Sequence, residues 1–97
     1  MDRITFLDSI SGINYPEMLV QFFDQFFALK MIVEDKGHIT VNESDQNSIS
    51  FIIEFDTKET KDIALSNVVS NYIVIYGKQV FININILDDR KIKIILQ

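Results

Sequence analysis

The number and spacing of the isoleucines constrain the fold most strongly. Seventeen of the 97 residues are Ile, whereas Ala occurs twice and Trp is absent. β-Branched side chains lose rotamer freedom in a helix and pack well on a pleated sheet. Apolar residues also alternate over 49–56 and again over 91–96, which is the period of a strand with one buried face. The chain is therefore expected to consist mainly of antiparallel sheet.

Length and composition point to a single domain over 1–97. The chain is 47% hydrophobic with three Gly and one Pro, which disfavours disorder. It has no Cys, so a disulfide scaffold and a Cys-based zinc site are excluded. The first residues lack a basic segment followed by a long apolar run, and no apolar run approaches the roughly 20 residues that span a bilayer. We expect a cytoplasmic protein that does not contact the membrane.

The first half is predicted to hold one helix and three strands. Pro16 opens a helix over 16–29, because proline is tolerated in the first helical turn. The runs 31–34 and 38–41 predict a hairpin with Gly37 in a left-handed conformation. A strand follows at 49–55. Residues 3–7 could form a short strand or the first turn of a helix.

The second half repeats this order with one ambiguous segment. Residues 57–70 favour a helix over a strand, with Asp56 as the N-cap and Glu59 as its partner. Residues 72–76 and 79–87 are predicted to form a hairpin across Gly77 and Lys78 through a type II′ turn.

A turn at 88–90 leads into a last strand at 91–96. The outer face of that strand carries Lys91 and Lys93. Lysines of this kind guard the edge of a sheet, so the last strand is expected to be an outer one.

The predicted fold class is α+β, with about six antiparallel strands and one or two helices on one face. The expected order is (β)αβββαβββ. The stretches 16–55 and 57–96 can each be read as one helix followed by three strands, and they align without gaps. The halves could therefore be an internal duplication, although an Ile-rich sheet produces such matches readily.

The usual catalytic signatures are missing. The chain has one histidine, His38, and it lacks both a nucleophile elbow and a glycine-rich phosphate loop. Asp56 and Lys58 resemble the Asp-x-Lys signature of metal-dependent nucleases, which also needs an upstream acid such as Glu43 or Asp45. A carboxylate-metal enzyme is therefore one alternative. The main expectation is a protein that is not an enzyme and that has no cofactor and no metal.

The net charge of −5 is concentrated in the middle of the chain. Residues 34–62 carry eight acids and three lysines, while the two ends nearly cancel. An acidic chain is a poor match for nucleic acid or an anionic membrane. The acids could form a patch that attracts a protein with a basic surface, or they could simply keep the domain soluble. The candidate partner-binding acids are Glu43, Asp45, Asp56, Glu59 and Asp62.

Four phenylalanines lie close together in the first predicted helix. Two of them are expected to fill the core, and the others could form a ridge for a partner or for a homodimer. Phe23 and Phe27 are the candidates for this ridge.

Three hypotheses about function follow. The first is a small acidic binding protein that neutralises a macromolecular partner, such as an anti-CRISPR-like phage inhibitor or a toxin-immunity protein. Its support includes the Ile-, Asn- and Lys-rich composition, which is typical of A+T-rich phage or mobile-element genes. The second is a homo-oligomeric chaperone-like or structural module, and the third is the carboxylate-metal enzyme.

Overall fold

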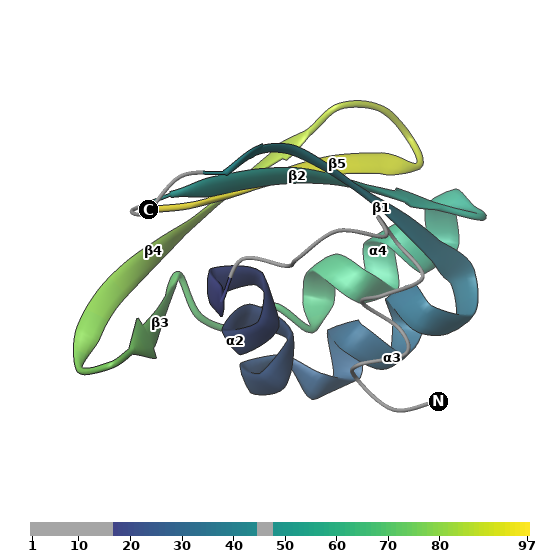
Figure 1. The fold of residues 1–97 in the computed structure, drawn as a ribbon. Helices are drawn as coiled ribbons and strands as arrows, with labels where there is room; N and C mark the ends of the chain where they lie inside the picture. The colour runs from purple at the N-terminus through teal and green to yellow at the C-terminus, as the bar shows by residue number, and fades with distance from the viewer. Residues whose placement is uncertain (1–16, 45–47) are drawn as a thin grey trace.

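The computed structural model describes residues 17–44 and 48–97, and within them three helices lie on one face of a five-stranded antiparallel sheet (Figure 1). The predicted α+β class is confirmed. The described residues form five strands where about six were expected, and three helices where one or two were expected. The elements, in order, are α2 (Glu17–Gln25), α3 (Phe27–Lys36), β1 (Gly37–Ser44), β2 (Ile49–Phe55), α4 (Lys58–Ser66), β3 (Tyr72–Ile75), β4 (Lys78–Ile86) and β5 (Lys91–Leu96).

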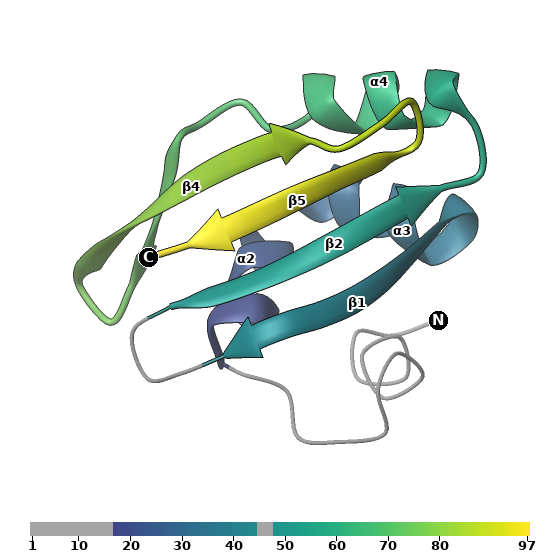
Figure 2. The ribbon, with the colours of Figure 1, turned by 90° about the horizontal axis from the view of Figure 1, so that it is seen from above.

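The strands lie in the order β1-β2-β5-β4-β3. Figure 2 shows β1, β2, β5 and β4 side by side. The central ladder joins β2 to β5, with Phe51 opposite Ile94 and Ile53 opposite Ile92. These side chains alternate with more polar ones, so one face of the sheet is apolar and faces the helices. The core is therefore a single layer between the sheet and the three helices.

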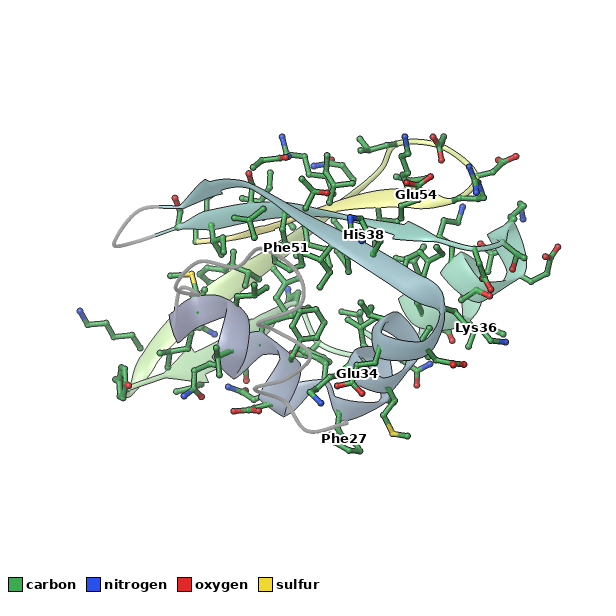
Figure 3. All side chains as sticks on the ribbon, turned by 45° about the vertical axis from the view of Figure 1, so that its right-hand side comes forward. Phe27, Glu34, Lys36, His38, Phe51 and Glu54 are labelled. Carbon is green, nitrogen blue, oxygen red and sulfur yellow. The ribbon has the colours of Figure 1, made fainter. Side chains whose placement is uncertain are left out.

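Phenylalanines from α2 and β2 fill the centre of this layer. Phe22 packs edge-on against Phe23 at 5.2 Å between ring centroids, and against Phe51 at 5.8 Å. Phe26 completes the group, 5.0 Å from Phe22. Leu19 lies one turn before Phe22 and Phe23 in α2 and is also fully buried. Figure 3 shows Phe51 between the sheet and the helices. The strand predicted at 49–55 is thus confirmed as the main contributor from the sheet.

The predicted strand at 31–34 is wrong, because these residues continue a helix. The helix bends at Phe26 and then runs from Phe27 to Lys36. Leu29 and Val33 are one turn apart and both are buried against the sheet. Burial of this stripe outweighs the strand preference of isoleucine and valine, which tertiary contacts often override.

Gly37 is also not in the left-handed conformation that the hairpin prediction required. Its φ of −140° is extended, and its N–H donates to the carbonyl of Val33 to end α3. The glycine is needed here for close approach, since a Cβ at this position would lie 3.1 Å from the Cα of Val33.

Residues 58–66 form helix α4, which confirms the preference for helix in this segment, but the predicted cap is one residue off. The N-cap is Thr57, whose Oγ1 accepts a hydrogen bond from the N–H of Thr60 at 3.1 Å. Asp56 instead donates its own N–H to the carbonyl of Lys36 at 3.0 Å, so its backbone connects the residue after β2 to the end of α3.

The predicted hairpin between β3 and β4 is confirmed, with a different turn. Tyr76 and Gly77 have φ values of 51° and 78°, and Ile75 pairs with Lys78 around them. Two successive positive φ values are typical of a type I′ turn, which suits the twist of a hairpin. The type II′ turn predicted at Gly77 and Lys78 is therefore wrong.

Strand β5 is not an outer strand, because it lies between β2 and β4 at the centre of the sheet. Lys91 and Lys93 consequently lie opposite Glu54 and Ile52 on the face that the helices leave open, and they do not guard an edge.

The two halves of the chain differ in the order of their elements. The first half contains two helices and two strands, so the expected order of one helix and three strands holds only for 57–96. The hairpins differ in register too. In the first half, Ile39 lies opposite Ile53. The gap-free equivalents of these two residues are Val80 and Ile94, but Ile94 lies opposite Ile84, which is four residues after Val80. The first strand of the expected order, residues 3–7, lies outside the described residues, as does Pro16.

Candidate functional site: a groove between two helices

The structure divides the predicted acidic patch between the two ends of the sheet. Glu43 lies at the end of β1 and pairs with Ser50, whereas Asp56 follows the opposite end of β2. Six residues of strand separate them, which corresponds to about 20 Å. The backbones of Glu43 and Asp56, two acids named in the metal-enzyme alternative, therefore lie at opposite ends of the β1–β2 hairpin. Asp45 lies outside the described residues.

The other two predicted acids lie together on α4. Glu59 and Asp62 are in the first two turns of this helix, and both side chains are exposed. Lys58 donates to Asp62 Oδ2 at 2.9 Å. This hydrogen bond lowers the pKa of the Asp62 carboxyl below its ordinary value, and the charge of Lys58 acts in the same direction. Asp62 is therefore ionised at neutral pH.

The two candidate phenylalanines lie in different environments. Phe23 is fully buried in the core, so it does not contribute to the surface. Phe27 begins α3 and is 62% exposed, and Figure 3 shows it on the side of the helices away from the sheet. The Nζ of Lys30 lies 5.7 Å from the centre of the Phe27 ring.

An open groove with a volume of 410 Å³ lies between α3 and α4. Met31 and Ile63 are its most exposed apolar side chains, at 54% and 57%. Phe27 lies one helical turn before Met31, so it extends the same apolar surface along α3. The full lining consists of Met31, Ile32, Asp35, Lys36, Thr60 and Ile63.

Two of the four lysines on these helices are turned inward, whereas Lys36 and Lys58 are exposed. Lys30 and Lys61 are each only 5% exposed. Lys30 bonds to Glu34 one turn further along α3, and the Nζ of Lys61 lies 3.5 Å from Asp62 Oδ1. Asp35 is exposed at the groove. The exposed charged side chains of the two helices are thus the three acids Asp35, Glu59 and Asp62 and the two lysines Lys36 and Lys58, a small acidic excess.

Over 17–44 and 48–97, no group of three or more His, Asp or Glu side chains is placed to hold a metal ion. His38 is exposed on β1, opposite Glu54 on the open face of the sheet. Figure 3 shows both on the side away from the helices. Within the same ranges, no helix is both long enough and apolar enough to cross a membrane.

Sequence reasoning missed Met31, Ile32 and Asp35 because it assigned this run to a hairpin. One signal was available. Lys30 and Glu34, like Phe27 and Met31, are four residues apart, which is the spacing of neighbours on one face of a helix.

Comparison with known proteins does not add to this description. No family model matches the chain, and neither a curated protein nor a solved structure matches it significantly. Function is therefore inferred from the geometry and charge of the groove.

Proposed function

We propose that this chain is a small non-catalytic binding protein that neutralises a protein partner by holding a basic amphipathic helix of that partner in the groove between α3 and α4. The observation that carries the proposal is the exposed apolar pair of Met31 and Ile63 in the groove, with Asp35 and Lys36 beside it. Two antiparallel or crossing helices with an apolar groove between them are a common receptor for a third helix.

Charge supports a basic partner. Asp35 and Lys36 line the groove, and Glu59 and Asp62 lie with Lys58 on the helix that forms one of its walls, so exposed acids outnumber exposed lysines by three to two. The net charge of the whole chain is −5, so the long-range field also attracts cations. A helix with lysine or arginine beside its apolar face would complement both features.

The size of the groove suits a short segment. Helix α3 has 10 residues, which corresponds to about 15 Å of helix and about three turns. A partner helix of similar length can place apolar side chains at one-turn intervals against Phe27, Met31 and Ile63. A phage anti-defence inhibitor or a toxin-immunity protein is a binding protein of this kind. The Ile-, Asn- and Lys-rich composition, which is typical of A+T-rich genes of phages and mobile elements, supports such an origin.

The test uses two model peptides and amide chemical shifts. One helical peptide has leucine on one face and lysine on the other, and its control has glutamate at every lysine position. We expect the lysine peptide to shift the amide signals of α3 and α4, with an affinity at least about tenfold higher than that of the control. Equal affinity of both peptides, or shifts confined to the sheet, would contradict the proposal.

A further inference from the structure

We propose that the outer edge of strand β4 over 84–86 binds an extended segment of a partner protein, in which two apolar residues flank a glutamate. The segment would add a short antiparallel strand to the sheet. This edge is open because β3 covers only the first part of β4: it pairs with Lys78–Phe81, whereas β4 continues to Ile86. Figure 2 shows the remainder of β4 along one border of the sheet, away from the groove between α3 and α4.

Main-chain hydrogen bonds alternate in direction along β4. The N–H of Phe81 donates to the carbonyl of Gln97 at 3.1 Å, and the N–H of Gln97 returns a bond of the same length, so Phe81 bonds on the side of β5. The N–H of Ile82 points the opposite way and donates to the carbonyl of Asn71 at 2.8 Å, on the side of β3. The register of β4 against β5 is regular over 82–86. The even-numbered residues of this stretch therefore bond away from β5.

Two even-numbered residues follow Ile82. Ile84 and Ile86 lie opposite Ile94 and Ile92, at the positions of the β4–β5 ladder without direct hydrogen bonds. Their N–H and C=O groups point to the side on which β3 lies further back along the sheet. Among the described strands, none pairs with Ile84 or Ile86 on that side. These two residues thus present four main-chain hydrogen-bonding groups to a further strand.

This part of β4 is accessible. Ile86 is 62% exposed, Ile84 is half-buried, and Asn83 and Asn85 are exposed. Within the described residues, the chain that leads from α4 to β3 forms a hydrogen bond to β4 only at Asn71. Edge strands with unpaired main-chain groups are templates for an added strand. An extended segment can therefore pair with β4 beyond the point where β3 ends.

The side of the sheet that faces the helices selects apolar residues in the bound segment. Ile84 and Ile86 point to this side, because their partners Ile94 and Ile92 are fully buried there. A residue of the added strand that lies opposite either isoleucine points to the same side. Two apolar residues at these positions would cover Ile84 and Ile86, and such cross-strand pairs are favourable.

The open face of the sheet selects an acid between those two apolar residues. Asn85 points to this face, beside Lys93 on β5. Lys93 lies between Asn85 and Ile52, neither of which is charged, whereas Lys91 lies opposite Glu54. A residue of the added strand opposite Asn85 lies two strands from Lys93, which corresponds to about 10 Å between backbones. Lysine and glutamate side chains together span this distance, so a glutamate would complement Lys93.

The site is short at both ends. The N–H of Ile82 is already bonded to Asn71, and the N–H of Leu87 donates to the carbonyl of Lys91 at 2.9 Å where the chain turns toward β5. The bound segment therefore pairs over three residues. Main-chain hydrogen bonds supply affinity in such strand addition, and alternate side chains supply specificity. The affinity is expected to be modest, below that of standard interfaces.

The test uses a blocked five-residue peptide with valine at the second and fourth positions, glutamate at the third and threonine at both ends. At about 5 mM peptide, where a millimolar complex is largely formed, the amide signals of Ile84 and Ile86 should shift. A matched peptide with N-methylated valines lacks two main-chain donors and should bind at least about tenfold more weakly. A second matched peptide with lysine in place of glutamate should bind about threefold more weakly.

Reciprocal charge changes test the role of Lys93. In Lys93→Glu the preference should reverse, so that the lysine peptide binds more tightly than the glutamate peptide. Lys78→Glu changes the net charge equally at the far end of β4, and it should keep the wild-type preference. Ile63→Asp, in the helical groove, should bind the glutamate peptide as the wild type does.

The main-chain contact is tested at Ile86. Ile86→Pro and Ile86→Ala both remove the isoleucine side chain, but only proline removes the outward N–H. Ile86→Pro should therefore bind the glutamate peptide about fivefold more weakly than Ile86→Ala. In the free protein, hydrogen exchange should be fast at the Ile84 and Ile86 amides and slow at Asn85, whose N–H bonds to β5.

Several outcomes would overturn the proposal. Slow exchange of the Ile84 and Ile86 amides in the free protein would show that this edge is closed. Unshifted signals of these two residues, or equal binding of the N-methylated peptide, would exclude strand addition. An unchanged charge preference in Lys93→Glu would contradict the acidic residue assigned to the bound segment.

Discussion

Gly37 and Val33 meet where helix α3 passes directly into strand β1. The N–H of Gly37 donates to the carbonyl of Val33, and a Cβ on Gly37 would lie 3.1 Å from the Cα of Val33. The two atoms nearest to such a Cβ are the Cα and the carbonyl oxygen of Val33, at 3.1 and 3.3 Å, and both belong to the backbone. Neither can therefore move without shifting the helix against the sheet. The contact fixes the position of α3, and α3 forms one wall of the groove.

Replacing this glycine is therefore expected to cost stability. Gly37→Ala should lower the free energy of unfolding by about 1–3 kcal/mol, the usual range for overpacking a tight site. The measurement is urea unfolding followed by circular dichroism. Gly77→Asn is the matched control, because nothing lies within 4 Å of that position and asparagine tolerates its φ of 78°. An equal loss in both variants would argue against the contact with Val33.

The N-cap of α4 offers a direct comparison of two neighbouring residues. Thr57→Ala removes the acceptor for the N–H of Thr60 and should cost about 1 kcal/mol of stability. Asp56→Ala removes the residue that the sequence indicates as the cap, and it should cost less. Unfolding midpoints of the two variants decide between them. The opposite order would place the cap at Asp56 after all.

Phe23 and Phe27 should respond very differently to truncation. Phe23 is fully buried, so Phe23→Ala should lower the free energy of unfolding by about 3–5 kcal/mol. Phe27 is mostly exposed, and Phe27→Ala should change it by less than about 1 kcal/mol. Thermal unfolding of both variants provides the measurement. A large loss of unfolding free energy in Phe27→Ala would mean that the Phe27 side chain stabilises the fold, which would contradict its place on an exposed surface.

The turn before β5 predicts a pH dependence. The N–H groups of Arg90 and Lys91 donate to Asp88 Oδ1 at 2.8 and 2.9 Å, and they lower the pKa of this carboxyl below its ordinary 3.8. Because the pKa is lower in the folded state, the stabilisation is complete above the unfolded value. It is lost as the pH falls through the folded value.

Two measurements check this sign. Carboxyl chemical shifts should show Asp88 titrating below 3.8 in the folded protein. Asp88→Asn keeps an oxygen acceptor but cannot ionise. Its stability should therefore fall less than that of the wild type between about pH 6 and about pH 2. A midpoint for Asp88 at or above 3.8, or an unchanged pH dependence in the variant, would contradict the assigned role of Asp88.

The predictable part of the fold was the part with a repeating pattern. Alternation over β2 and β5 identified both strands and their buried faces, because a period of two is typical of a strand with one face against a core. The run Met31–Glu34 was misassigned because its β-branched residues favour a strand locally. Its burial against the sheet, which decides for a helix, depends on residues far away in the sequence.

Strand order could not be read from the pattern at all. Lys91 and Lys93 suggested an outer strand, yet β5 pairs with β2 and β4 at the centre of the sheet. Charged residues on an open face look the same in a sequence as charged residues at an edge. The fold sets the difference, since the helices described here all cover the same face of the sheet.

The candidate site was predictable only in part. Glu59 and Asp62 lie on one wall of the groove, as members of the predicted acidic set. The backbone of Glu43 lies about 20 Å from that of Asp56, because the two residues are at opposite ends of the β1–β2 hairpin. Their separation in the sequence does not indicate this distance. The inward orientation of Lys30 and Lys61, which leaves a small acidic excess among the exposed charges of the two helices, has no sequence signal beyond its helical spacing.

The most direct test of binding in the groove compares the affinity of the lysine–leucine peptide for Ile63→Asp and for Val69→Asp. Both variants add one carboxylate at an exposed apolar position, but Ile63 lines the groove and Val69, at 84% exposure, follows α4. Any difference therefore reports apolar contact and not charge. We predict that Ile63→Asp weakens binding at least about tenfold, while Val69→Asp stays within about twofold of the wild type. Equal affinity for the two variants would contradict binding in the groove.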